Sequence, residues 1–198
     1  DPSTSDSNKF STAIDVFHHI ATDSIYINTP MAARAWGQLG SCYYKMNGDA
    51  STQGITNAAL RDVALQRYER ASEYFQNAIT NAQADVTTRS LAEIRLGQTQ
   101  AAMAALQPEQ RQKLLEDALG YFFSVFYEDN LRDNEQPDAS CLKEAGLEAG
   151  RLAGEMSDWK QAKQIYQKLL KLMPPLQSAI EKKIAYAEAQ ENLPAEKK

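Results

Sequence analysis

The residues best suited to chemistry in this sequence include two adjacent histidines. His18 and His19 are the only histidines of the chain, and imidazole is both a common zinc ligand and a common acid–base group. Neighbouring residues of a helix point about 100° apart, whereas ligands that share a metal on one helix face stand one turn apart. We therefore expect this pair to have a structural role and no catalytic or metal-binding one.

The two cysteines, Cys42 and Cys141, are too few for a disulfide framework and lie in separate helical segments. We expect both thiols to lie in the core or to be half-buried. The chain contains no H-E-x-x-H, no G-x-S-x-G and no glycine-rich phosphate loop. The sequence therefore predicts a protein that is not an enzyme and that has no cofactor and no metal site.

The acidic segment 128–135 superficially suggests calcium binding. It lacks the alternate oxygen ligands and the central glycine of an EF-hand loop, so we expect a solvated connection between helical units. The aromatic run just before this segment, at 121–127, is predicted to be helical, with two faces. Phe122, Val125 and Phe126 are expected on the face in the core, and Phe123 or Tyr127 is a candidate exposed contact residue on the opposite face.

The composition is that of an ordinary globular chain, with 43% hydrophobic residues, 24% charged residues and a net charge of −5. No run of five like charges occurs, so we expect no binding to nucleic acid. No window of 18 apolar residues occurs, so we expect no membrane span. Since the sequence begins at Asp1, we interpret it as a part of a longer protein. The sequence does not decide whether the protein is located in a bacterial cytoplasm or periplasm.

The elements that position these residues are predicted by a recurring pattern. A small residue, an aromatic four positions later and an aliphatic or small residue three positions after that mark one buried helix face. Four copies of one such pattern indicate an internal repeat. The copies are Ala13-Phe17-Ile20, Ala71-Phe75-Ala78, Ala118-Phe122-Val125 and Ala162-Tyr166-Leu169.

A second motif precedes three of these copies. Trp36, Leu39-Gly40 and Tyr43 spell W-x2-L-G-x2-Y, and the chain repeats its centre at Leu96-Gly97 and Ala149-Gly150. Together with Ala71 and Phe75, this resembles the tetratricopeptide repeat family, in a divergent, bacterial-type form with insertions. A glycine at this position lets two helices approach closely, while the large side chains fill the space beside it.

The resemblance implies an all-α fold, a right-handed superhelix of about eight helices that forms one domain over 1–198. The units exceed the 34 residues of the family: 31 residues separate Gly40 from Ala71, where 12 are expected, and the excess of 19 is placed at 47–66. Thr56 or Asn57 is expected to cap a long helix that ends near Ala82 and projects beyond an ordinary unit. The predicted parts are a lone second helix at 8–21, units at 30–82, 86–128 and 138–173, and a capping helix at 175–193.

The two ends of the chain differ in this scheme. The last helix carries Ile180, Ile184 and Ala187 on one face and charged residues elsewhere, as a terminal cap requires. The first helix lacks its partner. We therefore expect either further repeats upstream or self-association through the N-terminal end.

In the family, the first helices of successive units line a concave groove that binds peptides. The resemblance therefore implies a non-catalytic scaffold that binds a protein or peptide partner; the alternatives are an accessory domain of a larger enzyme or envelope assembly machine, or a self-associating module. The positions of the family's carboxylate-binding Lys and Asn hold Gly37 and Ser41, so that ligand is not expected. The implied partner-binding residues are Arg34, Gln38, Ser41, Tyr44, Lys45, Arg95, Gln98, Glu148 and Arg151; Leu91, Ile94, Glu144, Leu147 and Glu155 also fall on groove positions.

Overall fold

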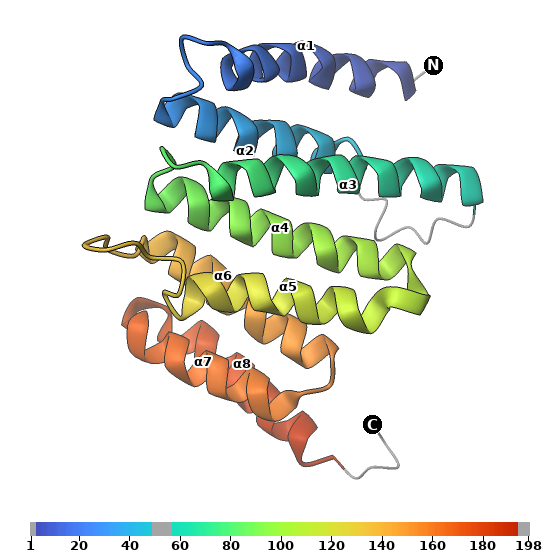
Figure 1. Cartoon of the computed structure of the whole chain (residues 1–198). Coiled ribbons are helices and arrows are strands. Elements are labelled where there is room, and N and C mark those ends of the chain that lie inside the picture. Colours follow the sequence, from blue (N-terminus) through green and yellow to red (C-terminus); the bar gives the residue numbers. More distant parts are fainter. Residues whose placement is uncertain (1–2, 49–56, 194–198) are drawn as a thin grey trace.

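The computed structural model describes residues 3–48 and 57–193, with side chains from residue 10 onward, and these residues form helices and no strand. Each helix packs against the next, which makes a layered stack with the two termini at opposite ends (Figure 1). This confirms the predicted all-α, solenoid-like fold. The helices are α1 (Ser3–Thr22), α2 (Pro30–Lys45), α3 (Ala58–Thr80), α4 (Val86–Leu106), α5 (Arg111–Phe126), α6 (Ala139–Glu155), α7 (Trp159–Leu172) and α8 (Gln177–Glu191), with short 3-10 turns at Pro108–Gln110 and Pro174–Leu176.

The start of α3 agrees with the predicted cap. The side-chain oxygen of Asn57 accepts hydrogen bonds from the backbone N–H groups of Ala59 and Leu60, at 2.9 and 3.4 Å, and so satisfies donors that a helix start leaves free. The other candidate cap, Thr56, and the turn-rich stretch 49–56 lie outside the described residues.

The projecting part of α3 has a partner that the sequence did not predict. Helix α3 has 23 residues and α4 has 21, against 16 in α2. Ala64 and Tyr68, in the first half of α3, pack against Ala102 and Leu106 at the end of α4. The extra residues of the second unit therefore lengthen α4 and cover the long α3.

The glycines of the repeated motif lie directly against the aromatic rings of the following helix. A Cβ atom added at any of them would fall far inside van der Waals contact with that ring. This confirms the interpretation that glycine permits close helix approach. The pairs, with the distance from the added Cβ to the nearest ring atom, are Gly40–Phe75 (2.6 Å), Gly97–Phe122 (2.7 Å) and Gly150–Tyr166 (2.4 Å).

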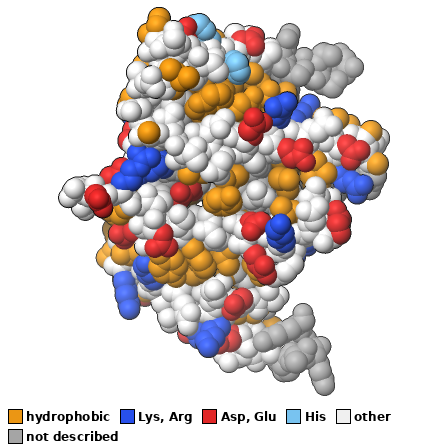
Figure 2. Space-filling view, viewed as in Figure 1, with side chains coloured by type: hydrophobic (Ala, Val, Ile, Leu, Met, Phe, Trp, Pro, Cys, Tyr) orange, Lys and Arg blue, Asp and Glu red, His pale blue; other side chains and the backbone are white. Residues whose placement is uncertain are grey.

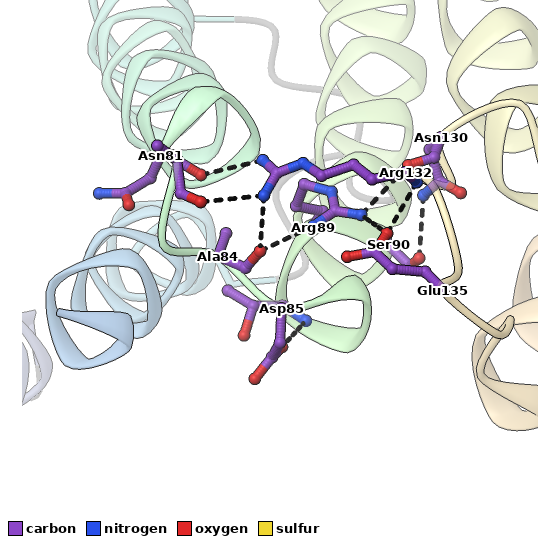
Figure 3. Close-up of polar contacts among 10 residues, drawn as sticks. Asn81, Ala84, Asp85, Arg89, Ser90, Asn130, Arg132 and Glu135 are labelled. Carbon is purple, nitrogen blue, oxygen red and sulfur yellow. Dashed lines mark hydrogen bonds and ion pairs between the residues drawn. The ribbon is translucent and has the colours of Figure 1, made fainter.

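The loop between α5 and α6 is more than the solvated connection that we expected. The guanidinium of Arg132, in this loop, donates hydrogen bonds to the backbone carbonyls of Asn81, Ala82 and Ala84 in the turn between α3 and α4, at 2.9–3.3 Å (Figure 3). Carbonyl groups at a helix end need such donors. The loop therefore ties the end of the first unit to the start of the third.

An ion pair between a buried arginine and a loop carboxylate anchors the same loop. Arg89 of α4 is 3% exposed, donates to the carbonyl of Ala84 at 2.7 Å and forms an ion pair with Glu135 of the loop (Figure 3). Hydrogen bonds from Arg89 and from the backbone N–H of Arg132 hold the pKa of Glu135 below its ordinary value. We call Arg89, Arg132 and Glu135 the arginine clasp.

Glu93 explains why the second unit departs from the motif. It takes the place of Trp36 of the first unit and is buried. Burial raises the pKa of its carboxyl group, an effect that Ser124 and Asn130 of the loop partly offset, and its Oε2 atom has no hydrogen-bond partner among the described residues. The residue therefore replaces an apolar filler with a polar contact to the loop that the arginine clasp holds.

Candidate functional site

The residues with potential chemistry lie apart from one another. The ring of His18 meets the edge of Trp36 at a centroid distance of 6.4 Å, and His19 lies 3.6 Å from Asp23. Cys42 and Cys141 are both free and buried, as predicted. Burial raises the pKa of both thiols, that of Cys141 to about 12, which opposes formation of the nucleophilic thiolate.

Two wider searches of the described residues are also negative. Residues 3–48 and 57–193 hold no group of three or more His, Cys, Asp or Glu side chains suited to a metal ion. None of the helices in these ranges is both long and apolar enough to cross a bilayer.

The described residues do form a large open cavity between α2 and α4, which we call the α2–α4 groove. Its volume is about 680 Å³. Five of the nine partner-binding residues that the resemblance implies for the family's groove line it: Arg34, Gln38, Ser41, Tyr44 and Lys45, all on α2. Arg95 lines it from α4 and makes a sixth. The remaining lining residues are Gly37, Phe75, Asp85, Thr87, Thr88, Leu91 and Ala92.

One end of the groove is closed by an ion pair between Arg34 and Asp85, at 2.7 Å. Asp85 is also the N-cap of α4 and accepts a hydrogen bond from the backbone N–H of Thr88 at 2.8 Å. Burial alone would raise the pKa of Asp85, but the hydrogen bonds from Arg34 and Thr88 outweigh it and lower this pKa. An Asp directly before a helical segment is a capping signal, so this residue was within reach of sequence analysis.

The same arrangement recurs one unit later. Thr87 of α4 donates a hydrogen bond at 2.9 Å to Asp138, the N-cap of α6. Hydrogen bonds from Ser140 and Thr87 lower the pKa of Asp138 to about 2. Each cap is therefore bound by a side chain from the preceding first helix, which holds α2, α4 and α6 in register.

Tyr44 lies near the end of α2 and lines the groove. Its ring packs against Tyr68 at a centroid distance of 5.6 Å. Burial raises the pKa of its phenol, and the charges of Arg95, Glu148 and Arg151 also act on that group. Charged residues of the second and third units are therefore close enough to Tyr44 to act on its phenol.

The predicted residues outside the groove lining are engaged with one another. Gln98 accepts a hydrogen bond from Arg95 at 2.6 Å. Arg151 pairs with Glu148 at 3.0 Å and with Glu155 at 3.1 Å. These side chains form a polar surface beside the groove. The expectation that Ile94 faces the groove is wrong, because this side chain has no exposed surface and belongs to the core.

Within the described ranges, some of the cationic side chains that line the groove are paired with carboxylates and one is not. Arg34 is neutralised by Asp85, and Arg95 lies 3.2 Å from Glu144. Lys45 is exposed, and no carboxylate among the described residues pairs with it. Figure 2 shows acidic and basic side chains interspersed with hydrophobic areas over one face of the molecule. The groove thus combines an apolar base with an uncompensated cation.

The fold defines an all-α stack of helix pairs. No protein-family model, curated protein or solved structure matches the chain. The likeness to tetratricopeptide repeats therefore stays a prediction from the sequence motif.

Proposed function

We propose that the chain is a non-catalytic interaction scaffold and that its α2–α4 groove binds a segment of another protein. The observation that carries the proposal is the cavity of about 680 Å³, lined by α2 residues of three kinds: cationic, hydrogen-bonding and aromatic. Protein segments commonly bind in such grooves through apolar anchors supported by polar contacts at the rim.

The groove residues suggest which features the segment has. Leu91 and Tyr44 line the groove, the first exposed and the second half-buried, and both offer apolar surface to an aliphatic or aromatic side chain. Lys45 is available for a carboxylate because it has no acidic partner among the described residues. Arg34 and Arg95 can exchange their present partners for a carboxylate of the ligand. A segment that combines apolar and acidic residues fits these features best.

The test is site-directed cross-linking combined with charge reversal. A photoreactive residue replaces Gln38 in the groove, and cross-linked proteins from the source cells are identified by mass spectrometry. The variant Arg34→Glu/Lys45→Glu should lose the cross-linked partners, because both cations of α2 are reversed. Circular dichroism should show unchanged helix content, since both side chains are exposed.

The matched control is Lys113→Glu/Lys171→Glu. It changes the net charge by the same amount at exposed positions of α5 and α7, away from the groove lining. The control should keep the partners of the wild-type chain. Equal cross-linking by the groove variant and the wild type would contradict the proposal.

A second candidate function is self-association through α1. It is favoured by a difference in burial between residues of α1 and the equivalent residues of α3, α5 and α7. Ala13, Phe17 and Ile20 of α1 are only half-buried, although Phe17 and Ile20 pack against Ala35 and Leu39 of α2. Their counterparts in α3, α5 and α7 are all buried. Helix α1 therefore leaves uncovered an apolar face that the other second helices bury, and Val16 beside it is 51% exposed.

Sedimentation velocity over a range of protein concentrations tests this candidate. Association through α1 predicts a dimer that dissociates in Val16→Glu and persists in Leu172→Glu, which places the same charge on an exposed apolar residue of α7. A chain that stays monomeric at every concentration excludes self-association.

A further inference from the structure

A second hollow lies at the other end of the stack, among α6, α7 and α8. We call it the C-terminal hollow; its volume is about 390 Å³, within the range of about 300–1,000 Å³ that is typical of ligand sites. Of the residues that the family resemblance places on groove positions, Arg151 and Glu155 line it. The lining residues are Gly150, Arg151, Gly154, Glu155, Trp159, Tyr166, Lys182, Lys183, Tyr186 and Ala187.

The hollow exists because α6 presents glycines where α7 presents rings. A Cβ atom on Gly150 would lie 2.4 Å from the ring of Tyr166, and one on Gly154 would lie 2.8 Å from the ring of Trp159. The rings of Tyr166 and Trp159 therefore form the wall of the hollow on the α7 side. The first helices of successive units contact one another: α4 contacts both α2 and α6. Helix α8 packs on α7 but makes no comparable contact with α6. The space between α6 and α8 stays open as a result.

Helix α8 completes the aromatic wall. Tyr186 meets Trp159 edge to face, at a centroid distance of 5.7 Å and an interplanar angle of 81°. Its side chain is nevertheless 59% exposed. A large aromatic side chain that is held by one neighbour and open to solvent on the other side resembles the anchor residues of binding interfaces.

The rim of the hollow is positively charged. Lys182 and Lys183 are exposed, and neither forms an ion pair with a carboxylate in the described part of the chain. The ammonium of Lys183 lies 5.7 Å from the ring centre of Tyr166. The other charges cancel, because Arg151 pairs with Glu155 at 3.1 Å. The hollow thus has an apolar interior and two uncompensated cations at its edge.

We propose that the C-terminal hollow binds one aromatic or long aliphatic side chain of a protein segment whose neighbouring residues are acidic. The side chain lies among Trp159, Tyr166 and Tyr186, and the flanking carboxylates meet Lys182 and Lys183. Charge complementarity selects this occupant, since a basic segment would bring like charges to the two lysines. The site is separate from the α2–α4 groove and does not depend on the function proposed for that groove.

The test is a selection of random octapeptides displayed on phage against the whole 198-residue chain. Enriched peptides should combine an aromatic or long aliphatic residue with acidic neighbours. Their affinity is then measured by the fluorescence of Trp159 in a Trp36→Phe background, which removes the only other tryptophan. Binding should weaken by about tenfold or more in Tyr186→Ala and in Lys182→Glu/Lys183→Glu.

Two control variants make the result specific. Arg34→Glu/Lys45→Glu alters the α2–α4 groove and should leave these affinities unchanged, as should Lys113→Glu/Lys171→Glu. No enrichment, a basic consensus, or equal affinity for the wild type and the two hollow variants would each overturn the proposal. Loss of binding only in Arg34→Glu/Lys45→Glu would assign the peptides to the groove and also overturn it.

Discussion

Two glycines on α2 offer a sharp test of how the helices of a unit pack. A Cβ atom added to Gly37 has its nearest neighbour, the Cβ of Ala78, at 4.0 Å, which is ordinary contact. A Cβ atom added to Gly40 would lie 2.6, 2.7 and 2.9 Å from three ring carbons of Phe75. Phe75 has no exposed surface, so its ring cannot move aside freely. The same substitution on the same helix therefore makes an ordinary contact at one position and meets a buried ring at the other.

The expected magnitudes follow from this contrast. Replacing glycine by alanine inside a helix stabilises it by about 0.5–1 kcal/mol at either position. Overpacking in a close-packed core costs about 1–3 kcal/mol, and this cost applies at Gly40 alone. Because the helix contribution is common to both variants, Gly37→Ala should be more stable than Gly40→Ala by about 1–3 kcal/mol.

Urea unfolding followed by circular dichroism measures this difference as a shift of the midpoint at constant slope. A double-mutant cycle identifies its source. In a Phe75→Leu background the ring is gone, so Gly40→Ala should cost less, with a coupling of about 0.5–3 kcal/mol. Equal stability of Gly37→Ala and Gly40→Ala, or additive effects in the cycle, would refute the reasoning that the ring requires the glycine.

Three further variants test other contacts. Gly120, on the exposed side of α5, has no atom within 4 Å of an added Cβ, so Gly120→Ala should raise the unfolding free energy by about 0.5–1 kcal/mol. Arg89→Ala removes a buried guanidinium that donates hydrogen bonds to the carbonyls of Ala84 and Asn130 and should lower the unfolding free energy by about 1–3 kcal/mol in urea unfolding; an unchanged midpoint would mean that the arginine clasp adds no stability. The pKa of Asp138 is lowered to about 2, so its contribution is present above about pH 4 and is lost as the pH falls toward 2. Asp138→Asn should therefore show a shallower loss of thermal stability over that pH range than the wild type, and equal slopes would contradict this assignment.

Periodic features of the fold were predictable from the sequence, because local spacing determines them. The pairing of Gly40 with Phe75 followed from one motif, and the start of α3 followed from Asn57 as a cap. Helix α1 starts at Ser3, earlier than the predicted residue 8. The buried position of Ile94 was missed because the motif does not separate the groove face from the core face at neighbouring helix positions.

Contacts between distant segments were not predictable in the same way. Arg132 reaches a carbonyl 51 residues earlier in the chain, and Arg89 reaches Glu135 across 46 residues. No periodicity marks such pairs, because each occurs once. The C-terminal hollow escaped prediction for a related reason: it depends on how far α8 stands from α6, which local spacing does not determine.

The arginine clasp has a consequence for how the stack responds to load. In a simple solenoid each layer touches only its neighbours, so that layers can peel away one at a time from either end. Here Arg132 joins the α5–α6 loop to the turn that closes the first unit, with α4 held between them. Pulling on the two ends of the chain should therefore release α3 to α6 in one step at a higher force, while α1 and α8 peel off earlier.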